Sequence, residues 1–376
     1  MALTNFGALT DEQLTTWSRD FWRVARNNSF INKFAGSGSN AMVQRITDLT
    51  KSAKGTRAVL TLIAEAQGDG ITGDNTMEGN EEALRAYDMV VNIDQLRFAN
   101  RHEGKMAEQA SVVNFRETSR DILAYQMADR IDQLAFLTLS GVSYAYKNNG
   151  ALRPVLPGQG QNLTDLEFAA DVSAPTTNRH LRVDVSGGVG SLVAGDTTAL
   201  AAGDVLSYKI IVDLKAYAKD HYIRGIRSGS DEIYHMFVTP RQMAKLKLDS
   251  DFLANVRNAG VRGDSNPLFA GTSSVMVDGI MIHEYRHVFN TVGAASGSKW
   301  GATGVLDGAR ALFCGAQALG MADIGAPSMV EEGFDYGNSQ GIAIGKIFGF
   351  KKPKFRSDYD AAVEDFGVIA VDTLLA

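Results

Sequence analysis

The chain has 376 residues, of which 45% are hydrophobic and 21% are charged, a composition typical of a globular protein with two or more subdomains. Its 43 acidic and 37 basic side chains give a net charge of −6, which argues against tight binding to a nucleic-acid backbone, because such binding needs clustered Lys and Arg. The single cysteine, Cys314, excludes an internal disulfide and a cysteine-based zinc site, and its apolar surroundings favour a buried thiol.

The beginning of the chain and its hydropathy predict neither a signal peptide nor a transmembrane helix. The opening MALTNFGALTDEQL lacks a basic segment followed by an apolar one. No run of about 18 apolar residues, the length that spans a bilayer, occurs in the sequence. We therefore expect no membrane partner.

Residues 1–55 predict an N-terminal arm that contains one short helix. Thr10 is a suitable helix cap, and apolar residues follow it at helical spacing: Leu14, Trp17, Phe21 and Val24. An arm with such an apolar stripe needs a surface to cover it. We therefore expect contacts with a neighbour through three aromatic residues of this helix, Trp17, Phe21 and Trp22.

Residues 56–100 predict an extended β-hairpin. TRAVLTLIAEAQ is strand-like, and AYDMVVNIDQL places alternate apolar residues on one face: Tyr87, Met89, Val91 and Ile93. The connection GDGITGDNTMEGNEE is rich in Gly and acidic residues, with too little apolar content to anchor it in a core. This hairpin is expected to project from the globular body, as in proteins that reach over their neighbours.

The best helical pattern of the sequence runs from Lys105 to Leu139. Its apolar stripe consists of Leu123, Met127, Ile131, Leu134 and Thr138, and Gly141 is well placed to end the helix. An unbroken helix of this length would be a rod of roughly 50 Å. The stretch NFRETSRD weakens the stripe and marks a place where the helix kinks or faces solvent.

The remainder of the chain predicts a mixed α+β body with few βαβ units. Residues 146–203 are rich in Gly, Thr and Asn and predict an irregular segment or a small β insertion. A helix capped by Asp204 follows, then a strand, a helix that begins at Pro240, and a hairpin that turns at Asp278-Gly279. The stretch GARALFCGAQALGMA predicts a strand or a short helix, and the C-terminal stretches are strand-like.

The stretch IMIHEYRHVFN contains the zinc-protease spacing His283-Glu284-x-x-His287. On a helix the two imidazoles would lie roughly 6 Å apart and would share an ion. On a strand they would lie about 13 Å apart. The alternation of Met281, His283, Tyr285 and His287 after a hairpin turn predicts a strand, so we expect no metal site; a zinc metallopeptidase is kept as an unfavoured alternative.

The acidic connection at 69–82 also fails as a calcium-binding loop. Counted from Asp69, an EF-hand loop has Ile71 at its third position, and counted from Asp74 it has Thr76 there. Only incidental cation binding at an acidic tip stays open. No motif in the chain predicts a catalytic constellation or a cofactor, so we expect no enzymatic activity.

Several blocks of the sequence resemble tailed-phage major capsid proteins, in the branch typified by coliphage N-four. The first block is GDGITGDNTMEGNEEALRAYDMVVNIDQLRFANR. Later blocks follow in the family's order: VTPRQMAKLKLDSDF, VDGIMIHEYRHV, ARALFCGAQALGMA and FDYGNSQGIAIGKIFGFKKPKF. The resemblance extends from about Trp17 to the C-terminus, except at 150–203, which has no family pattern.

The resemblance implies an α+β fold of the Hong Kong 97 type. In chain order, its expected parts are an N-terminal arm 1–55, an extended hairpin (the E-loop) 56–100, a peripheral domain with a spine helix 101–145, an insertion 146–203, an axial domain 204–345, and C-terminal strands 346–376 that return to the peripheral domain.

The resemblance also implies a structural role. Copies of the chain would assemble as hexamers and pentamers into the icosahedral head shell, first as a procapsid in the host cytoplasm and then as the virion. The implied partners are other copies of the chain, a scaffolding protein, a portal, in some phages a decoration protein, and double-stranded DNA held by non-specific contact. A mildly acidic inner surface suits DNA packing, because it repels phosphate. A scaffold or decoration protein is the alternative within the virion.

The site residues expected from this role lie at the tip of the E-loop. We expect inter-subunit contacts from Asp69, Asp74, Asn75, Glu78, Glu81 and Glu82. Their expected basic partners on neighbouring copies are Arg120, Arg130, Lys351 or Lys352. The alternative is that these acidic side chains only keep the tip solvated.

Overall fold

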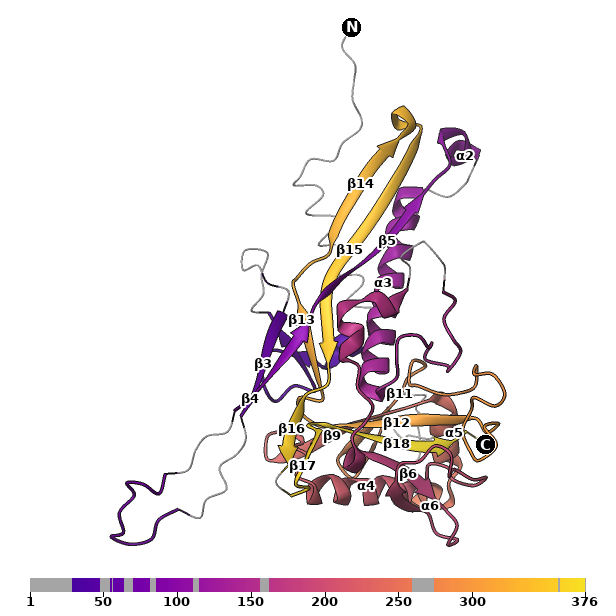
Figure 1. Ribbon diagram of the computed structural model, residues 1–376. Coiled ribbons are helices and arrows are strands. Elements are labelled where there is room, and N and C mark those ends of the chain that lie inside the picture. Colours follow the sequence, from indigo (N-terminus) through magenta and orange to yellow (C-terminus); the bar gives the residue numbers. More distant parts are fainter. Residues whose placement is uncertain are drawn as a thin grey trace.

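The computed structural model describes residues 29–47, 55, 57–63, 70–81, 86–110, 115–155, 162–258, 274–357 and 359–375. Figure 1 shows an elongated upper body built on a long helix, and a lower body built on a large sheet. A thin loop projects away from the junction of the two. The mixed α+β class predicted from the sequence is confirmed. No helix in these residues is long and apolar enough to cross a membrane.

The upper body combines the long helix α3 (Phe115–Ser140) with a six-stranded sheet. Its strands are β1 (Ala35–Gly36), β2 (Val43–Ile46), β5 (Asp94–Arg101), β13 (Leu319–Asp323), β14 (Ser328–Phe334) and β15 (Ser339–Lys351). β15 is the organising strand, because β13, β14 and β5 all pair with it in antiparallel register. Two short helices accompany this body, η1 (Ile31–Phe34) and α2 (Lys105–Ala110), and η5 (Asp335–Gly337) joins β14 to β15.

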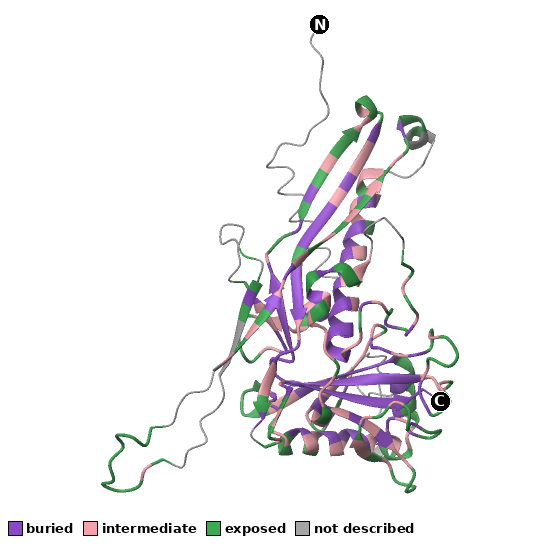
Figure 2. Ribbon diagram, viewed as in Figure 1, coloured by how far each residue is buried: buried purple, intermediate pink, exposed green. Residues whose placement is uncertain are grey.

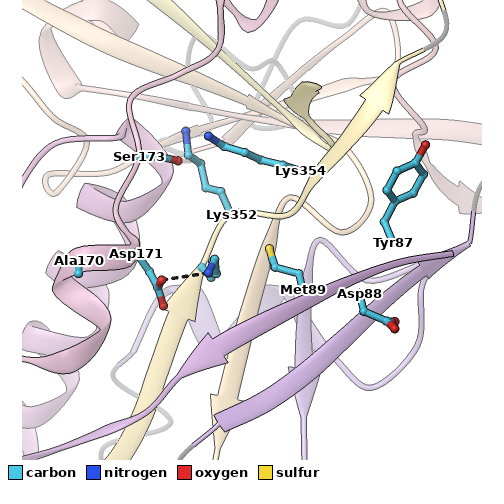
Figure 3. Close-up of a pocket in the computed structure, with 9 residues that line it drawn as sticks. Tyr87, Asp88, Met89, Ala170, Asp171, Ser173, Lys352 and Lys354 are labelled. Atoms are coloured by element: carbon cyan, nitrogen blue, oxygen red, sulfur yellow. Dashed lines mark hydrogen bonds and ion pairs between the residues drawn. The ribbon is translucent and has the colours of Figure 1, made fainter. Parts of the chain in front are cut away.

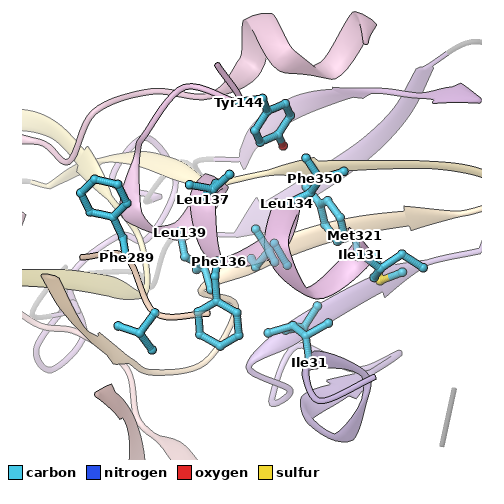
Figure 4. Close-up of a cluster of buried hydrophobic side chains, with 14 of the residues drawn as sticks. Ile31, Ile131, Leu134, Phe136, Leu137, Leu139, Tyr144, Phe289, Met321 and Phe350 are labelled. Atoms are coloured by element: carbon cyan, nitrogen blue, oxygen red, sulfur yellow. The ribbon is translucent and has the colours of Figure 1, made fainter. Parts of the chain in front are cut away.

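The apolar stripe predicted for the long helix is its buried face. Leu123, Met127, Ile131, Leu134 and Thr138 are all buried. Figure 4 shows part of this stripe packed beside Ile31, Tyr144, Met321 and Phe350, which come from four other segments of the chain. Burial of such side chains stabilises the fold by about 1.5–3 kcal/mol each. Of the stretch NFRETSRD, residues 115–121 form the first turns of α3. Residues 111–114 lie outside the described residues, so the unbroken rod stays a prediction.

Gly141 ends the long helix, as predicted. Its φ of +67° lies in the left-handed region, and the amides of Gly141 and Val142 donate to the carbonyls of Thr138 and Leu137 at 3.1 and 3.0 Å. A Cβ atom at this position would stand 2.5 Å from the carbonyl oxygen of Ser173. Glycine is therefore required here for its φ angle and for its lack of volume.

The predicted hairpin consists of β3 (Arg57–Ile63) and β4 (Ala86–Asn92), paired in antiparallel register from Arg57↔Asn92 to Ile63↔Ala86. Val91 and Ile93, on the predicted apolar face, pack with Ile46, Ala58 and Ala322. The base of the hairpin is thus fixed to the upper body. Beyond it, residues 70–81 project from the molecule.

The lower body is an eight-stranded sheet in the order β10-β11-β9-β12-β18-β6-β7, with β8 also paired to β9. The strands are β6 (His180–Asp184), β7 (Ser191–Ala194), β8 (Ile226–Ser228), β9 (Asp231–Val238), β10 (Ser274–Val277), β11 (Ile280–Glu284), β12 (Gly308–Cys314) and β18 (Val368–Leu374). Three helices pack on this sheet: α4 (Tyr208–Asp220), α5 (Pro240–Leu248) and α6 (Ser250–Asn258). Their apolar side chains and those of the sheet form the second hydrophobic core of the molecule. The segment 146–203 contributes β6 and β7 and three short helices, η2 (Leu163–Asp165), η3 (Glu167–Asp171) and η4 (Thr177–Arg179).

Two local predictions in the lower body are confirmed and one is wrong. The turn between β10 and β11 has Asp278 at φ +46° and Gly279 at φ +75°, and Thr239 with Gln242 forms a capping box before Pro240. The predicted cap at Asp204 is wrong, because Ser207 occupies the N-cap position of α4. The buried Asp204 carboxylate instead accepts hydrogen bonds from the amides of Val185 and Ala201 at 3.0 and 2.8 Å.

The strand pairing differs from the predicted blocks 204–345 and 346–376. β15 crosses the boundary between them, and β13 and β14 belong to the upper sheet although they lie within the first block. β18 does not return to the upper body but lies between β12 and β6 in the lower sheet. A separate two-stranded ribbon, β16 (Lys354–Ser357) and β17 (Ala362–Asp365), connects β15 to β18. Which distant strands pair depends on the whole fold, so local periodicity did not reveal it.

Candidate assembly surfaces

The loop tip at residues 70–81 is the most exposed part of the described chain. Figure 2 shows it almost entirely exposed, well away from the rest of the molecule. Asp74, Asn75, Glu78 and Glu81 are exposed here, while Asp69 and Glu82 lie outside the described residues. The predicted arm contacts Trp17, Phe21 and Trp22 also lie outside them.

The tip is shaped by its own hydrogen bonds. Asn75 Nδ2 donates to the carbonyl of Thr72 at 2.8 Å, and the amide of Gly79 donates to Glu81 Oε2 at the same distance. Its three carboxylates, Asp74, Glu78 and Glu81, form no ion pair within the described residues. Met77, between them, is 67% exposed. The tip thus presents unpaired negative charge and one well-exposed apolar side chain, that of Met77, which are groups that a basic and partly apolar partner surface would satisfy.

The four predicted basic partners already have contacts within the same chain. Lys352 is buried and its Nζ lies 2.9 Å from the carboxylate of Asp365, so the prediction that it meets a neighbour's loop is wrong for this conformation. Lys351 is held by Asp171 at 2.9 Å and by the carbonyl of Val90 at 2.8 Å.

On α3, the Arg120 guanidinium lies 3.0 Å from Asp121, and Arg130 donates to Gln133 Oε1 at 2.6 Å. Both arginine side chains keep about a third of their surface exposed, 30% and 31%. They therefore stay candidates for contacts between copies, at the exposed side of the long helix.

The two histidines of the protease-like spacing do not meet. β11 ends at Glu284, so the predicted strand is shorter than expected and His287 lies in the turn that follows it. His283 Nε2 is 3.0 Å from Nδ1 of His235, and His287 Nε2 is 2.7 Å from Asp129 Oδ1. No group of three His, Cys, Asp or Glu side chains within the described ranges is arranged to hold a metal ion.

Each of the two histidines has a structural role: His283 packs among aromatic rings, and His287 bonds to the carboxylate of Asp129. Rings of Phe34 and Phe237 lie 5.1 and 5.5 Å from the His283 ring, and burial lowers the pKa of His283 to about 4. The imidazole is therefore neutral at pH 7, as a side chain in an aromatic environment should be. The hydrogen bond from His287 lowers the pKa of Asp129 to about 2, and so holds that carboxyl ionised.

Asp132 anchors the start of the described chain to α3, a role that the sequence pattern did not reveal. Its carboxylate accepts four hydrogen bonds, from Ser29 Oγ at 2.7 Å, the amides of Phe30 and Ile31 at 2.7 and 3.1 Å, and Tyr285 Oη at 2.6 Å. Burial raises the pKa of Asp132, and the four donors oppose this shift. A carboxyl group on the apolar face of a helix is the only sequence signal for such an anchor.

A second buried cluster joins the two bodies. Arg310 on β12 binds Asp372 on β18 through two guanidinium nitrogens, at 2.7 and 2.9 Å. Its third nitrogen donates to the carbonyl of Ser140, the last residue of α3, at 2.9 Å, and His180 lies 2.6 Å from Asp372. This Arg310–Asp372–His180 cluster fixes the end of the long helix on the lower sheet.

A hollow of about 560 Å³ lies beside the base of the hairpin. Figure 3 shows Tyr87 and Met89 of β4 on one side of it, Asp171 and Ser173 on another, and Lys352 and Lys354 above them. The ion pair between Lys351 and Asp171 crosses its edge. Its lining contains both acidic and basic side chains and forms part of the surface beside the base of the hairpin.

Comparison with known proteins assigns this architecture to one family. A family model described as phage capsid protein matches residues 5–376. The major capsid protein of Pseudomonas phage KPP25 is 58% identical over 371 residues, which cover 98% of this chain and 96% of that protein.

Two solved capsid structures have a similar fold. The capsid of Ralstonia phage GP4 is matched with a TM-score of 0.72 and 28% identity, over 92% of this chain and 90% of that one. The capsid of Cyanophage Pam1 is matched with a TM-score of 0.70 and 18% identity, over 100% and 96% of the two chains. Because the family match and the Pseudomonas phage relative both extend over almost the whole sequence, this chain belongs to the phage capsid protein family and is a major capsid protein of a tailed phage.

Proposed function

We propose that copies of this chain assemble as hexamers and pentamers into an icosahedral head shell around double-stranded DNA, and that the hairpin β3–β4 joins each copy to a neighbour. The observation that carries this role is the exposed tip at 70–81. It has unpaired carboxylates and projects beyond the body into which the rest of the described chain folds. Many weak contacts, repeated by symmetry, close a shell without any catalytic step. The protein then acts as a structural subunit and not as an enzyme.

The finer parts of the proposal rest on the resemblance of the sequence to tailed-phage major capsid proteins. The fold would be of the Hong Kong 97 type, with α3 as the spine helix, the upper body as the peripheral domain and the lower body as the axial domain. The blocks from GDGITGDNTMEGNEE onward support membership in the branch typified by coliphage N-four. Assembly in the host cytoplasm would involve a scaffolding protein and a portal, with a decoration protein as a further partner in some phages and DNA held non-specifically.

The deciding experiment removes the tip alone. Residues 70–81 are replaced by a short Gly-Ser linker, and the variant is compared with the wild-type chain by circular dichroism, thermal unfolding and negative-stain electron microscopy. We expect a folded subunit with an unchanged melting temperature, because the tip makes its hydrogen bonds within itself. Shells, tubes or capsomers should be lost.

A matched control shortens a different exposed loop. The turn Ser186–Gly190 between β6 and β7 is also rich in glycine, and its replacement by the same linker should leave assembly intact. Normal shells from the variant without the tip would contradict the proposed role of the hairpin. Unfolding of that variant would show that the tip belongs to the fold and not to an arm for neighbours.

A further inference from the structure

The ribbon β16–β17 presents one face with unpaired positive charge. Lys354 and Arg356 lie on the same face of β16, because they are two residues apart on a strand. Neither forms an ion pair within the described part of the chain, and Arg356 is exposed. Val363, the partner of Arg356 across the ribbon, is 59% exposed. This face is thus basic and partly apolar.

Two exposed tyrosines lie at the turn end of the ribbon. Tyr222, just after α4, and Tyr359, in the ribbon's turn, are 78% and 61% exposed, with their ring centroids 5.9 Å apart. The turn is fixed to α4 by the hydrogen bond of 2.8 Å between His221 Nδ1 and Asp360. Tyr222 has a φ of +54°, which is unfavourable for a bulky residue, yet the fold keeps its ring in solvent. Exposed aromatic rings held on a rigid support are typical anchors of protein interfaces.

The hollow at the base of the hairpin continues this surface, since Lys354 is one of its lining residues. Its two other lysines are already matched, Lys351 by Asp171 and Lys352 by Asp365. Asp88, at the rim, points away from Lys354 in Figure 3. The positive charge available to a partner is therefore that of Lys354 and Arg356. We call the surface of Lys354, Arg356, Val363, Tyr222 and Tyr359 the ribbon face.

We propose that the ribbon face of one copy binds the loop tip 70–81 of a second copy. The two surfaces are complementary, because the tip offers Asp74, Glu78 and Glu81 without cationic partners and an exposed Met77. Carboxylates would meet Lys354 and Arg356, and the Met77 thioether would pack on the tyrosine rings. Figure 1 shows the chain's own tip apart from its own ribbon, so the occupant we propose comes from a neighbour. This inference rests on the proposed role of the hairpin and names its receiving site.

Another basic surface allows a strict control. Arg241 and Lys245 are exposed on α5, one helical turn apart, and neither forms an ion pair within the described ranges. That helix, PRQMAKLKL, carries no aromatic side chain. Reversal of its two charges changes the net charge of the chain as much as reversal of the ribbon charges, at a site without the tyrosine pair.

The test compares four full-length variants by shell yield in electron microscopy and by circular dichroism. Loss of two ion pairs at each repeated contact should lower shell yield at a fixed subunit concentration by roughly tenfold or more. We expect this loss for K354E/R356E and for D74K/E78K, with folded subunits in both cases. The control R241E/K245E should assemble like the wild-type chain. The fourth variant carries all four changes, D74K/E78K/K354E/R356E, and should recover shells because the reversed charges match again.

The outcomes separate the two proposals. If removal of the tip abolishes shells but K354E/R356E assembles normally, the hairpin joins neighbours through another receiving surface and the ribbon face is wrong. Equal loss in R241E/K245E, or no recovery in the fourth variant, would also overturn the ribbon face. Recovery by charge exchange supports it, because a general folding defect would not be corrected by a second pair of substitutions.

Discussion

Some polar side chains in the interior of this molecule take their partners from distant segments of the chain. Asp132 on α3 accepts hydrogen bonds from residues about a hundred positions earlier and from Tyr285, and His283 contacts His235 on the neighbouring strand. These contacts form only in the folded state. The pKa of a titratable group in such a contact therefore differs between the folded and the unfolded chain. This difference makes the free energy of unfolding depend on pH, in a range that can be derived for each group.

His283 predicts a loss of stability in mild acid. Its pKa of about 4 in the folded chain lies below the ordinary value of 6.5, because the imidazole is buried among Phe34, Phe237 and His235, with Lys33 nearby. Between these two pH values the unfolded chain binds more protons. This contribution to stability is therefore complete above pH 6.5 and decreases as the pH falls toward 4, by about 1–2 kcal/mol after allowance for solvent screening.

The measurement is urea unfolding of the dissociated subunit at a series of pH values. The variant His283→Gln cannot gain a proton in this range, so its free energy of unfolding should decrease less between pH 6.5 and 4 than that of the wild-type chain. Identical pH slopes in the two proteins would show that His283 is already exposed or already charged when folded. Asp129 does not interfere, because its pKa of about 2 places its titration at lower pH.

At the scale of elements, local sequence patterns predicted the structure correctly where a single segment decides its own conformation. The stripe of α3, the Asp278-Gly279 turn and the start of α5 at Pro240 are examples. The prediction at Asp204 failed because a carboxylate three residues before the N-cap of a helix can close a loop instead of capping the helix. The candidate site was predicted in part: the tip is exposed as expected, whereas Lys352 proved to be buried, which no local pattern indicates.

The end of α3 provides a test at this scale. Gly141→Ala would force a Cβ atom to within 2.5 Å of the Ser173 carbonyl oxygen while the residue keeps a φ of +67°. We expect the free energy of unfolding to decrease by about 2–4 kcal/mol, because the strain of the left-handed backbone and the steric overlap add. Denaturant unfolding of the subunit measures the change.

Gly188→Ala is the matched control. Gly188 has a φ of +81° in the turn between β6 and β7, but a Cβ atom there would meet nothing within 4 Å. That substitution should therefore show the backbone strain alone, about 1 kcal/mol. If the two variants lose equal stability, the contact with Ser173 has no effect and the helix end relaxes around it.

At the scale of the whole molecule, the two bodies are joined by contacts between segments far apart in the sequence. Within the lower body, β18 near the C-terminus pairs with β6, and within the upper body, β15 pairs with β5 of the N-terminal half. Between the bodies, the Arg310–Asp372–His180 cluster fixes α3 on the lower sheet. The family resemblance implied two separate blocks with a late return of the chain. The structure instead distributes the second half of the chain over both sheets.

Arg310 is the residue through which this connection between the bodies can be tested. Arg310→Ala would leave the Asp372 carboxylate buried with only His180 beside it, and would remove the donor to the carbonyl that ends α3. Loss of one partner from a buried ion pair lowers the free energy of unfolding by about 3–5 kcal/mol. Hydrogen exchange should accelerate most in β6, in β18 and at the C-terminal turn of α3, because these are the segments that Arg310 connects.

The control is Lys209→Ala, which breaks the exposed pair of Lys209 with Asp213 on α4 and should change stability by no more than about 0.5 kcal/mol. Faster exchange confined to β12 in the Arg310 variant would show that the two bodies are held together by other contacts.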